Sequence, residues 1–104
     1  MIRGFLAIAT ALVSAQAAMA LTPGAQRGEL FARTNCAMCH ATGSAGLSPL
    51  PVAPPFRTLH NRYPVEDLAE ALAEGIVTGH PSMPQFRLDP AQIDDLIEYL
   101  KTLE

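Results

Sequence analysis

The chain has 104 residues, which is enough for one domain and no more. Seven Lys and Arg residues against ten Asp and Glu residues give it a formal net charge of −3 at pH 7. This acidic balance argues against binding to nucleic acid or to an anionic membrane surface, and it favours a basic docking patch on any protein partner.

Residues 1–20 are predicted to be a signal peptide that is cleaved after Ala20. Arg3 supplies a positive charge, residues 5–13 form a short apolar stretch, and Ala18-Met19-Ala20 offers small residues where a signal peptidase reads them. The alternative is a membrane anchor, but a spanning helix needs about twenty predominantly apolar residues. Polar residues interrupt this stretch: Thr10, Ser14 and Gln16. We therefore expect an exported, periplasmic protein without stable membrane insertion, whose residues 21–104 form one domain.

Cleavage removes one charge, Arg3, so the remaining 84 residues (104 − 20) carry six basic and ten acidic side chains, a net charge of −4. A domain this small usually needs an additional stabilising element, such as disulfides, a metal or a large buried group. Cys36 and Cys39 are the only cysteines, and a bridge between them would close a loop of a few residues, which constrains the unfolded chain little. Another buried group is therefore expected to complete the core.

The first predicted helix covers about residues 23–36. Thr22 is a suitable N-cap and Pro23 occupies the first helical position. Leu30 and Phe31 are expected to supply its apolar contacts.

The second predicted helix begins at Pro64, and Gly75 suits its C-terminus. Apolar residues recur at helical spacing along it: Val65, Leu68, Ala69, Leu72 and Ile76. Its polar face is acidic: Glu66, Asp67, Glu70 and Glu74.

The third predicted helix has the clearest signals. Asp89 caps it, Pro90 starts it, and Gln92 stands three residues after the cap as in a capping box. One apolar stripe follows: Ile93, Leu96, Ile97, Leu100 and Leu103. The charged residues between them are expected to face water: Asp94, Asp95, Glu98 and Lys101.

Two long loops separate the helices. Residues 43–63 hold several prolines, a density that argues against helix or central strand, and residues 78–88 hold two more. No segment shows the alternation of a strand, so the fold class is predicted to be all-α. Long loops within a compact domain usually carry function.

Cys36-Ala37-Met38-Cys39-His40 has the spacing of the attachment sequence for c-type haem. At the end of a helix, two cysteines three residues apart lie on roughly one face, so both sulfurs can reach the vinyl groups on one edge of a porphyrin. The following residue, His40, can then point its imidazole toward the iron. The motif predicts one covalent haem c with His40 as an axial ligand.

Other interpretations of the two cysteines have less support. A thioredoxin-like redox pair belongs in a strand–helix context that is absent here. A structural zinc site would need two further ligands, for which only His60 and His80 remain. A simple disulfide is allowed in an exported protein.

Over essentially the whole of residues 25–104, the chain resembles the small class I monohaem cytochromes c. The resemblance rests on the attachment sequence, a methionine loop well downstream and an amphipathic C-terminal helix. It implies that the terminal helices cross around the haem and meet through Gly28, Phe31 and Tyr99.

Met83 is the predicted sixth ligand of the iron. Met38 lies between the attached cysteines and cannot fold back to the iron, whereas Met83 lies in a loop between Pro81 and Pro84. The resemblance favours Met83, because the family places its distal methionine in a proline-rich loop ahead of the last helix. His80, and more weakly His60, are the competing ligands.

The resemblance also implies a proline carbonyl that accepts a hydrogen bond from the proximal histidine. Pro54 is the candidate, followed two residues later by the apolar Phe56, and Pro51 or Pro55 could serve instead. The chain lacks the tryptophan that many relatives place near a haem propionate, a role that is open to Arg57, Arg62 or Tyr63.

The sequence thus predicts a one-electron carrier and not an enzyme, since a haem with two protein ligands has no open site for a substrate. Its partners would be a redox donor and a redox acceptor, with the chain either monomeric or bound in a redox complex. Two alternatives differ in function. One is a dedicated haem subunit of an oxidoreductase complex, and the other is a haem sensor or weak peroxidase with a labile sixth ligand.

Overall fold

The computed structural model describes residues 4–5, 7–11, 21–75 and 83–104. Within these residues, three α-helices and two 3₁₀ helices follow each other: α1 (Pro23–Asn35), η1 (Phe56–Asn61), η2 (Val65–Asp67), α2 (Leu68–Glu74) and α3 (Pro90–Lys101). The described residues contain no strand, and the predicted all-α class is confirmed. None of their helices is long and apolar enough to cross a membrane.

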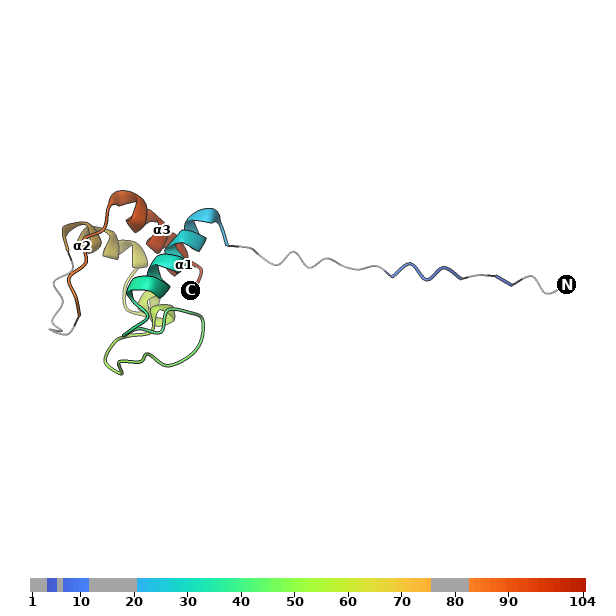
Figure 1. Ribbon diagram of the computed structural model, residues 1–104, viewed down its shortest axis with the longest axis horizontal. Coiled ribbons are helices and arrows are strands. Elements are labelled where there is room, and N and C mark those ends of the chain that lie inside the picture. Colours follow the sequence, from blue (N-terminus) through green and yellow to red (C-terminus); the bar gives the residue numbers. More distant parts are fainter. Residues whose placement is uncertain (1–3, 6, 12–20, 76–82) are drawn as a thin grey trace.

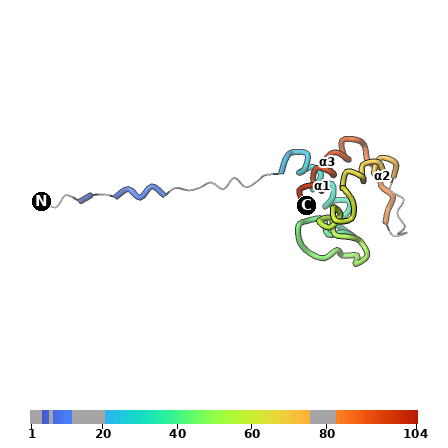
Figure 2. The backbone as a smooth tube through the Cα atoms, turned by 180° about the vertical axis from the view of Figure 1, so that it is seen from behind, coloured from blue at the N-terminus to red at the C-terminus, as the bar shows by residue number. Residues whose placement is uncertain are grey.

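Helices α1 and α3 cross each other, and α2 packs on α3 beside them (Figure 1). The long connection after α1 lies on one side of this helical group, as Figure 2 shows from behind. The attachment sequence begins where α1 ends, so the helix crossing fixes the start of the loop that carries the cysteines and His40.

A close approach of backbones at Gly28 makes this crossing possible. A Cβ placed on Gly28 would overlap the carbonyl oxygen of Asp95, and it would lie 2.8 Å from Cβ of Tyr99. Gly28 and Tyr99, two of the three residues expected from the resemblance, therefore lie at the contact between the terminal helices. Phe31 packs against the core cluster to which both helices contribute.

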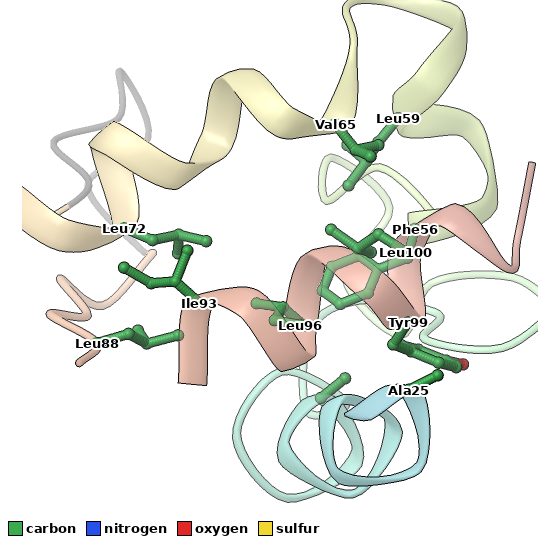
Figure 3. Close-up of a cluster of buried hydrophobic side chains, with 11 residues drawn as sticks. Ala25, Phe56, Leu59, Val65, Leu72, Leu88, Ile93, Leu96, Tyr99 and Leu100 are labelled. Carbon is green, nitrogen blue, oxygen red and sulfur yellow. The ribbon is translucent and has the colours of Figure 1, made fainter. Parts of the chain in front are cut away.

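The core is a cluster of apolar side chains from all the helices (Figure 3). From α3 it takes the predicted stripe, with Ile93, Leu96 and Leu100 buried and Ile97 and Leu103 packed against them. The second helix adds Val65 and Leu72, while its acidic residues are exposed as predicted. Ile76 lies outside the described residues.

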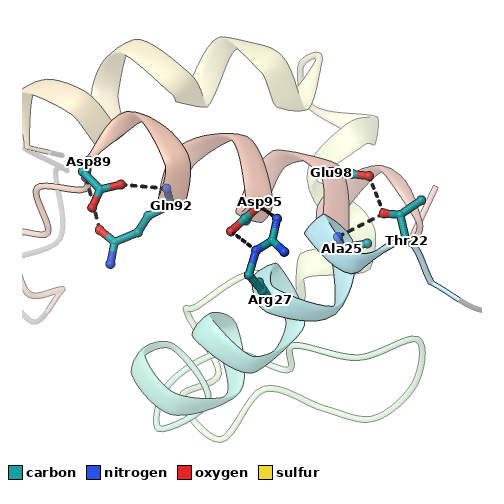
Figure 4. Close-up of polar contacts among 7 residues, drawn as sticks. All are labelled: Thr22, Ala25, Arg27, Asp89, Gln92, Asp95 and Glu98. Carbon is teal, nitrogen blue, oxygen red and sulfur yellow. Dashed lines mark hydrogen bonds and ion pairs between the residues drawn. The ribbon is translucent and has the colours of Figure 1, made fainter.

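The helix ends follow the predicted signals. The Thr22 hydroxyl caps α1 by accepting a hydrogen bond from the Ala25 N–H, and Asp89 and Gln92 form the complete capping box of α3 (Figure 4). Gly75 ends α2 with a φ of 93°, a conformation that favours glycine.

Four details differ from the sequence-based expectations. The second helix opens as the 3₁₀ turn η2, and η1 lies within the predicted loop 43–63, because the run of prolines stops at Pro55. Leu30 is 65% exposed and supplies no core contact. Asp95 does not face water freely: its side chain is 18% exposed and pairs with Arg27 of α1 at 2.9 Å (Figure 4).

Candidate haem attachment site

The attachment sequence forms one hydrogen-bonded turn at the C-terminus of α1. Cys36 is the C-cap, and its carbonyl accepts hydrogen bonds from the N–H groups of Cys39 at 3.2 Å and His40 at 3.0 Å. Cys36 and Cys39 are half-buried and are not joined by a disulfide. This tight turn brings both thiols and the imidazole together within five residues.

Burial raises the pKa of the Cys36 thiol to about 11. The thiol is therefore protonated near neutral pH, so little thiolate is present to take part in disulfide exchange. Among the residues that the structure describes, no group of three or more His, Cys, Asp or Glu side chains is arranged to hold a metal ion. These observations give no support to a zinc site or a thioredoxin-like pair.

His40 is held by a hydrogen bond to the backbone. Its Nδ1 lies 2.8 Å from the carbonyl oxygen of Pro54, the proline proposed from the sequence ahead of Pro51 and Pro55. Because a carbonyl oxygen only accepts, Nδ1 must carry the proton and donate, so the lone pair of the neutral ring lies on Nε2. The imidazole is thus fixed in the tautomer that leaves Nε2 available to a metal.

A second set of contacts joins the residues around His40 to the proline-rich loop. The Leu50 N–H donates to the Cys39 carbonyl at 3.0 Å, and the Phe56 N–H donates to the Ala41 carbonyl at 2.9 Å. The Ala41 N–H donates to the Ser48 hydroxyl at 3.0 Å. The chain on either side of His40 is therefore tied to residues 48–56.

Sequence reasoning missed the roles of Ser48 and Phe56. Phe56 stood out only as an apolar residue after Pro54, yet its ring packs on the imidazole of His40 with 5.0 Å between ring centroids. Nothing local in the sequence marks Ser48, because its contact depends on the path of the loop between it and Ala41.

The structure also ties this loop to the last helix. Tyr99 is buried, and its hydroxyl donates a hydrogen bond to the carbonyl oxygen of Thr42, two residues beyond His40. Burial, and then the nearby Glu29 carboxylate, raise the pKa of Tyr99, so the phenol stays protonated and able to donate. This contact was also beyond the sequence-based predictions.

The candidate distal ligands come from different segments of the chain. Met83 is half-buried at the start of the segment that leads into α3, whereas Met38 is 88% exposed. His60 is exposed on η1, and His80 lies outside the described residues. Of the propionate candidates, Arg57 donates to the Gly46 carbonyl at 2.7 Å.

The donor set fits a covalently bound haem: two unpaired thiols on one turn, followed directly by an imidazole whose Nε2 is available. Together with the all-helical fold, this defines a small c-type haem protein. The family model described as Cytochrome c matches residues 25–104. The chain is also 32% identical over 85 residues to a "Cytochrome c-553-like" protein of Synechocystis sp., an alignment that covers 82% of this chain and 74% of that protein.

The chain belongs to the cytochrome c family. Its cofactor is haem c with its iron, bound covalently, and Cys36 and Cys39 have the attachment spacing. The general function that follows is haem-based electron transfer. No solved structure matches the chain.

Proposed function

We propose that the protein carries single electrons between redox proteins in the periplasm, with its haem attached through Cys36 and Cys39 and its iron held by His40 and Met83. The hydrogen bond from His40 Nδ1 to the Pro54 carbonyl is the observation that carries the proposal. It selects the tautomer that an iron ligand needs and fixes the ring in place.

With Met83 as the second axial ligand, the protein would act as an electron carrier and not as an enzyme. Iron with both axial positions filled has no open site for a substrate, and a thioether favours ferrous iron and raises the reduction potential relative to histidine. The half-buried Met83 precedes Pro84, whose fixed φ stiffens the chain next to the ligand. We infer on this basis that Met83, and not His80 or His60, binds the iron.

The distribution of charge supports docking to a partner with a basic patch. No Asp, Glu, Lys or Arg occurs between Arg33 and Arg57, the segment that contains the attachment sequence. Acidic residues are instead concentrated in η2, α2 and α3. Charge would then steer the approach of a basic partner over a distance, while the surface next to the cysteines stays uncharged.

Steering of this kind makes the second-order rate of electron exchange with a basic partner fall as ionic strength rises, because salt screens exposed charges. A rate that rises with salt would contradict a basic partner.

The proposed export depends on residues 1–20. The mass of the mature protein from an exporting host would show whether the chain is cleaved after Ala20.

The optical spectrum of the haem-loaded protein tests the ligands. We expect narrow α and β bands after reduction and a weak band at the red end of the oxidised spectrum. The red band should be lost in Met83→Ala and kept in Met38→Ala, a matched control because Met38 is an exposed methionine of the same chain.

Other outcomes would overturn the proposal in distinct ways. Haem that lacks the red band in the wild-type protein would assign the distal position to His80, His60 or an open site. Binding of carbon monoxide to the reduced wild-type protein at neutral pH would indicate a sensor or peroxidase, and firm co-purification with a catalytic partner would indicate a dedicated subunit.

A further inference from the structure

The ring of Phe56 lies against the imidazole of His40. The two ring centroids are 5.0 Å apart and the planes are tilted by 44°. This separation falls within the range of favourable aromatic pairs, about 4.5–7 Å. Phe56 is 8% exposed and belongs to the core cluster, so its ring cannot turn away without disturbing its neighbours.

The backbone around Phe56 is braced on both sides. Its N–H donates to the Ala41 carbonyl at 2.9 Å, directly beyond His40. Pro54 and Pro55 precede it with fixed φ angles, and Thr58 donates to the Pro55 carbonyl through its hydroxyl at 2.7 Å. Phe56 is thus fixed relative to the residue whose ring it touches.

Pro54 and Phe56 constrain different motions of the imidazole. The hydrogen bond at Nδ1 fixes where that edge of the ring points, but it leaves rotation about the N–H···O direction free. A second ring packed against the imidazole opposes that rotation. Two residues on one braced segment therefore define both the direction and the plane of the imidazole.

We propose that Phe56 is a positioning residue for the proximal ligand, whose ring sets the plane of the His40 imidazole while the Pro54 carbonyl sets its direction. The inference rests on the proposed function, in which His40 binds the iron. Groups around a metal-bound histidine fix the orientation of its ring and tune the metal. In the haem-loaded protein, the plane of the imidazole would then determine how its π orbitals overlap with those of the iron.

The test compares haem-loaded wild-type protein with Phe56→Leu, Phe56→Tyr and Leu59→Ala. Leu59 is the matched control, because it is buried to 6% exposure in the same 3₁₀ helix and packs in the same cluster. Proton resonances of the haem methyl groups in the oxidised protein report the plane of the axial imidazole. Chemical denaturation reports stability separately.

We expect Phe56→Leu to change the order and spread of the haem-methyl resonances and to shift the reduction potential. Phe56→Tyr, which keeps the ring, should restore the wild-type pattern. Leu59→Ala should lower stability at least as much as Phe56→Leu and leave the resonances in their wild-type order.

A wild-type pattern in Phe56→Leu would overturn the inference and leave Phe56 as an ordinary core residue. A change of similar size in Leu59→Ala would overturn it as well, since loosening of the core alone would then move the imidazole. Failure of the proposed function appears earlier and separately, as a wild-type spectrum without the features of His/Met ligation.

Discussion

Replacement of Gly28 by alanine tests whether the terminal helices touch as closely as the structure shows. A Cβ at this position would overlap the carbonyl oxygen of Asp95 and lie 2.6 Å from its carbonyl carbon. Carbon atoms in contact normally lie about 3.5–4.0 Å apart, so α1 and α3 would have to separate by roughly 1 Å. Backbone atoms are in the way, and no side-chain rotation can relieve the overlap.

The magnitude follows from two opposing effects. Overpacking costs about 1–3 kcal/mol and occasionally more, and the rigid obstacle at Asp95 places Gly28→Ala at the upper end. The higher helix propensity of alanine returns up to about 1 kcal/mol. We expect a net loss of about 2 kcal/mol, which for a domain of this size lowers Tm by roughly 8–16 °C.

Gly24→Ala is the matched control on the same helix. Its Cβ would meet the carboxylate end of Glu98, an exposed side chain that can rotate away at the loss of its hydrogen bond from the Thr22 hydroxyl. We expect stability within about 0.5 kcal/mol of the wild-type value. The assay is thermal denaturation of the haem-loaded proteins, followed by circular dichroism. Equal Tm values for Gly28→Ala and Gly24→Ala would refute the close approach of the two helices as the cause.

Three further changes probe single contacts. Tyr99→Phe removes the hydroxyl that donates a hydrogen bond to the buried Thr42 carbonyl. We expect urea denaturation to show a free energy of unfolding lower by about 1–3 kcal/mol. An unchanged free energy of unfolding would mean that water satisfies the carbonyl. Asp89→Ala removes the N-cap of α3 and should cost about 1 kcal/mol by the same assay, whereas Asp89→Asn should restore most of it. Lys101→Gln breaks the exposed pair with Glu66, 2.7 Å apart, whose hydrogen bond from Lys101 lowers the pKa of Glu66 and raises that of Lys101. A lowered carboxyl pKa stabilises the fold above the unfolded pKa, and this stabilisation is lost as the pH falls through the folded pKa. The raised lysine pKa stabilises the fold below about pH 10. The small, salt-sensitive difference between variant and wild type should therefore be present near pH 7 and be lost progressively as the pH falls below about 4. A difference that persisted in acid would rule out the ion pair as its cause.

The helices were predictable because their signals are local. Asp89, Pro90 and Gln92 specify the start of α3 within four residues, and the apolar period of 3.6 specifies its buried face. The same period could not place Asp95, which adjoins the buried stripe but is covered by Arg27 of another helix. Periodicity identifies an apolar face and not the neighbour that packs beside it.

The residues of the candidate site also differ in whether their sequence signal is local. Cys36, Cys39 and His40 are contiguous, so one turn of chain fixes their relation and a motif can reveal it. The contact of Pro54 with His40 was expected from a family resemblance, but Ser48 and Phe56 act through a loop path that no local pattern encodes. Met83 is separated from the attachment turn by most of the chain, and its ligation remains a prediction.

Tyr99 connects the helix crossing to the proximal side of the site. Its Cβ lies at the surface that Gly28 leaves open, and its hydroxyl reaches the Thr42 carbonyl beyond His40. Packing at Cβ and the hydrogen bond at the hydroxyl therefore link the position of α3 to that of the loop after His40. If Gly28→Ala moves α3 away from α1, we expect Tyr99 to move with it and to strain its hydrogen bond to the Thr42 carbonyl.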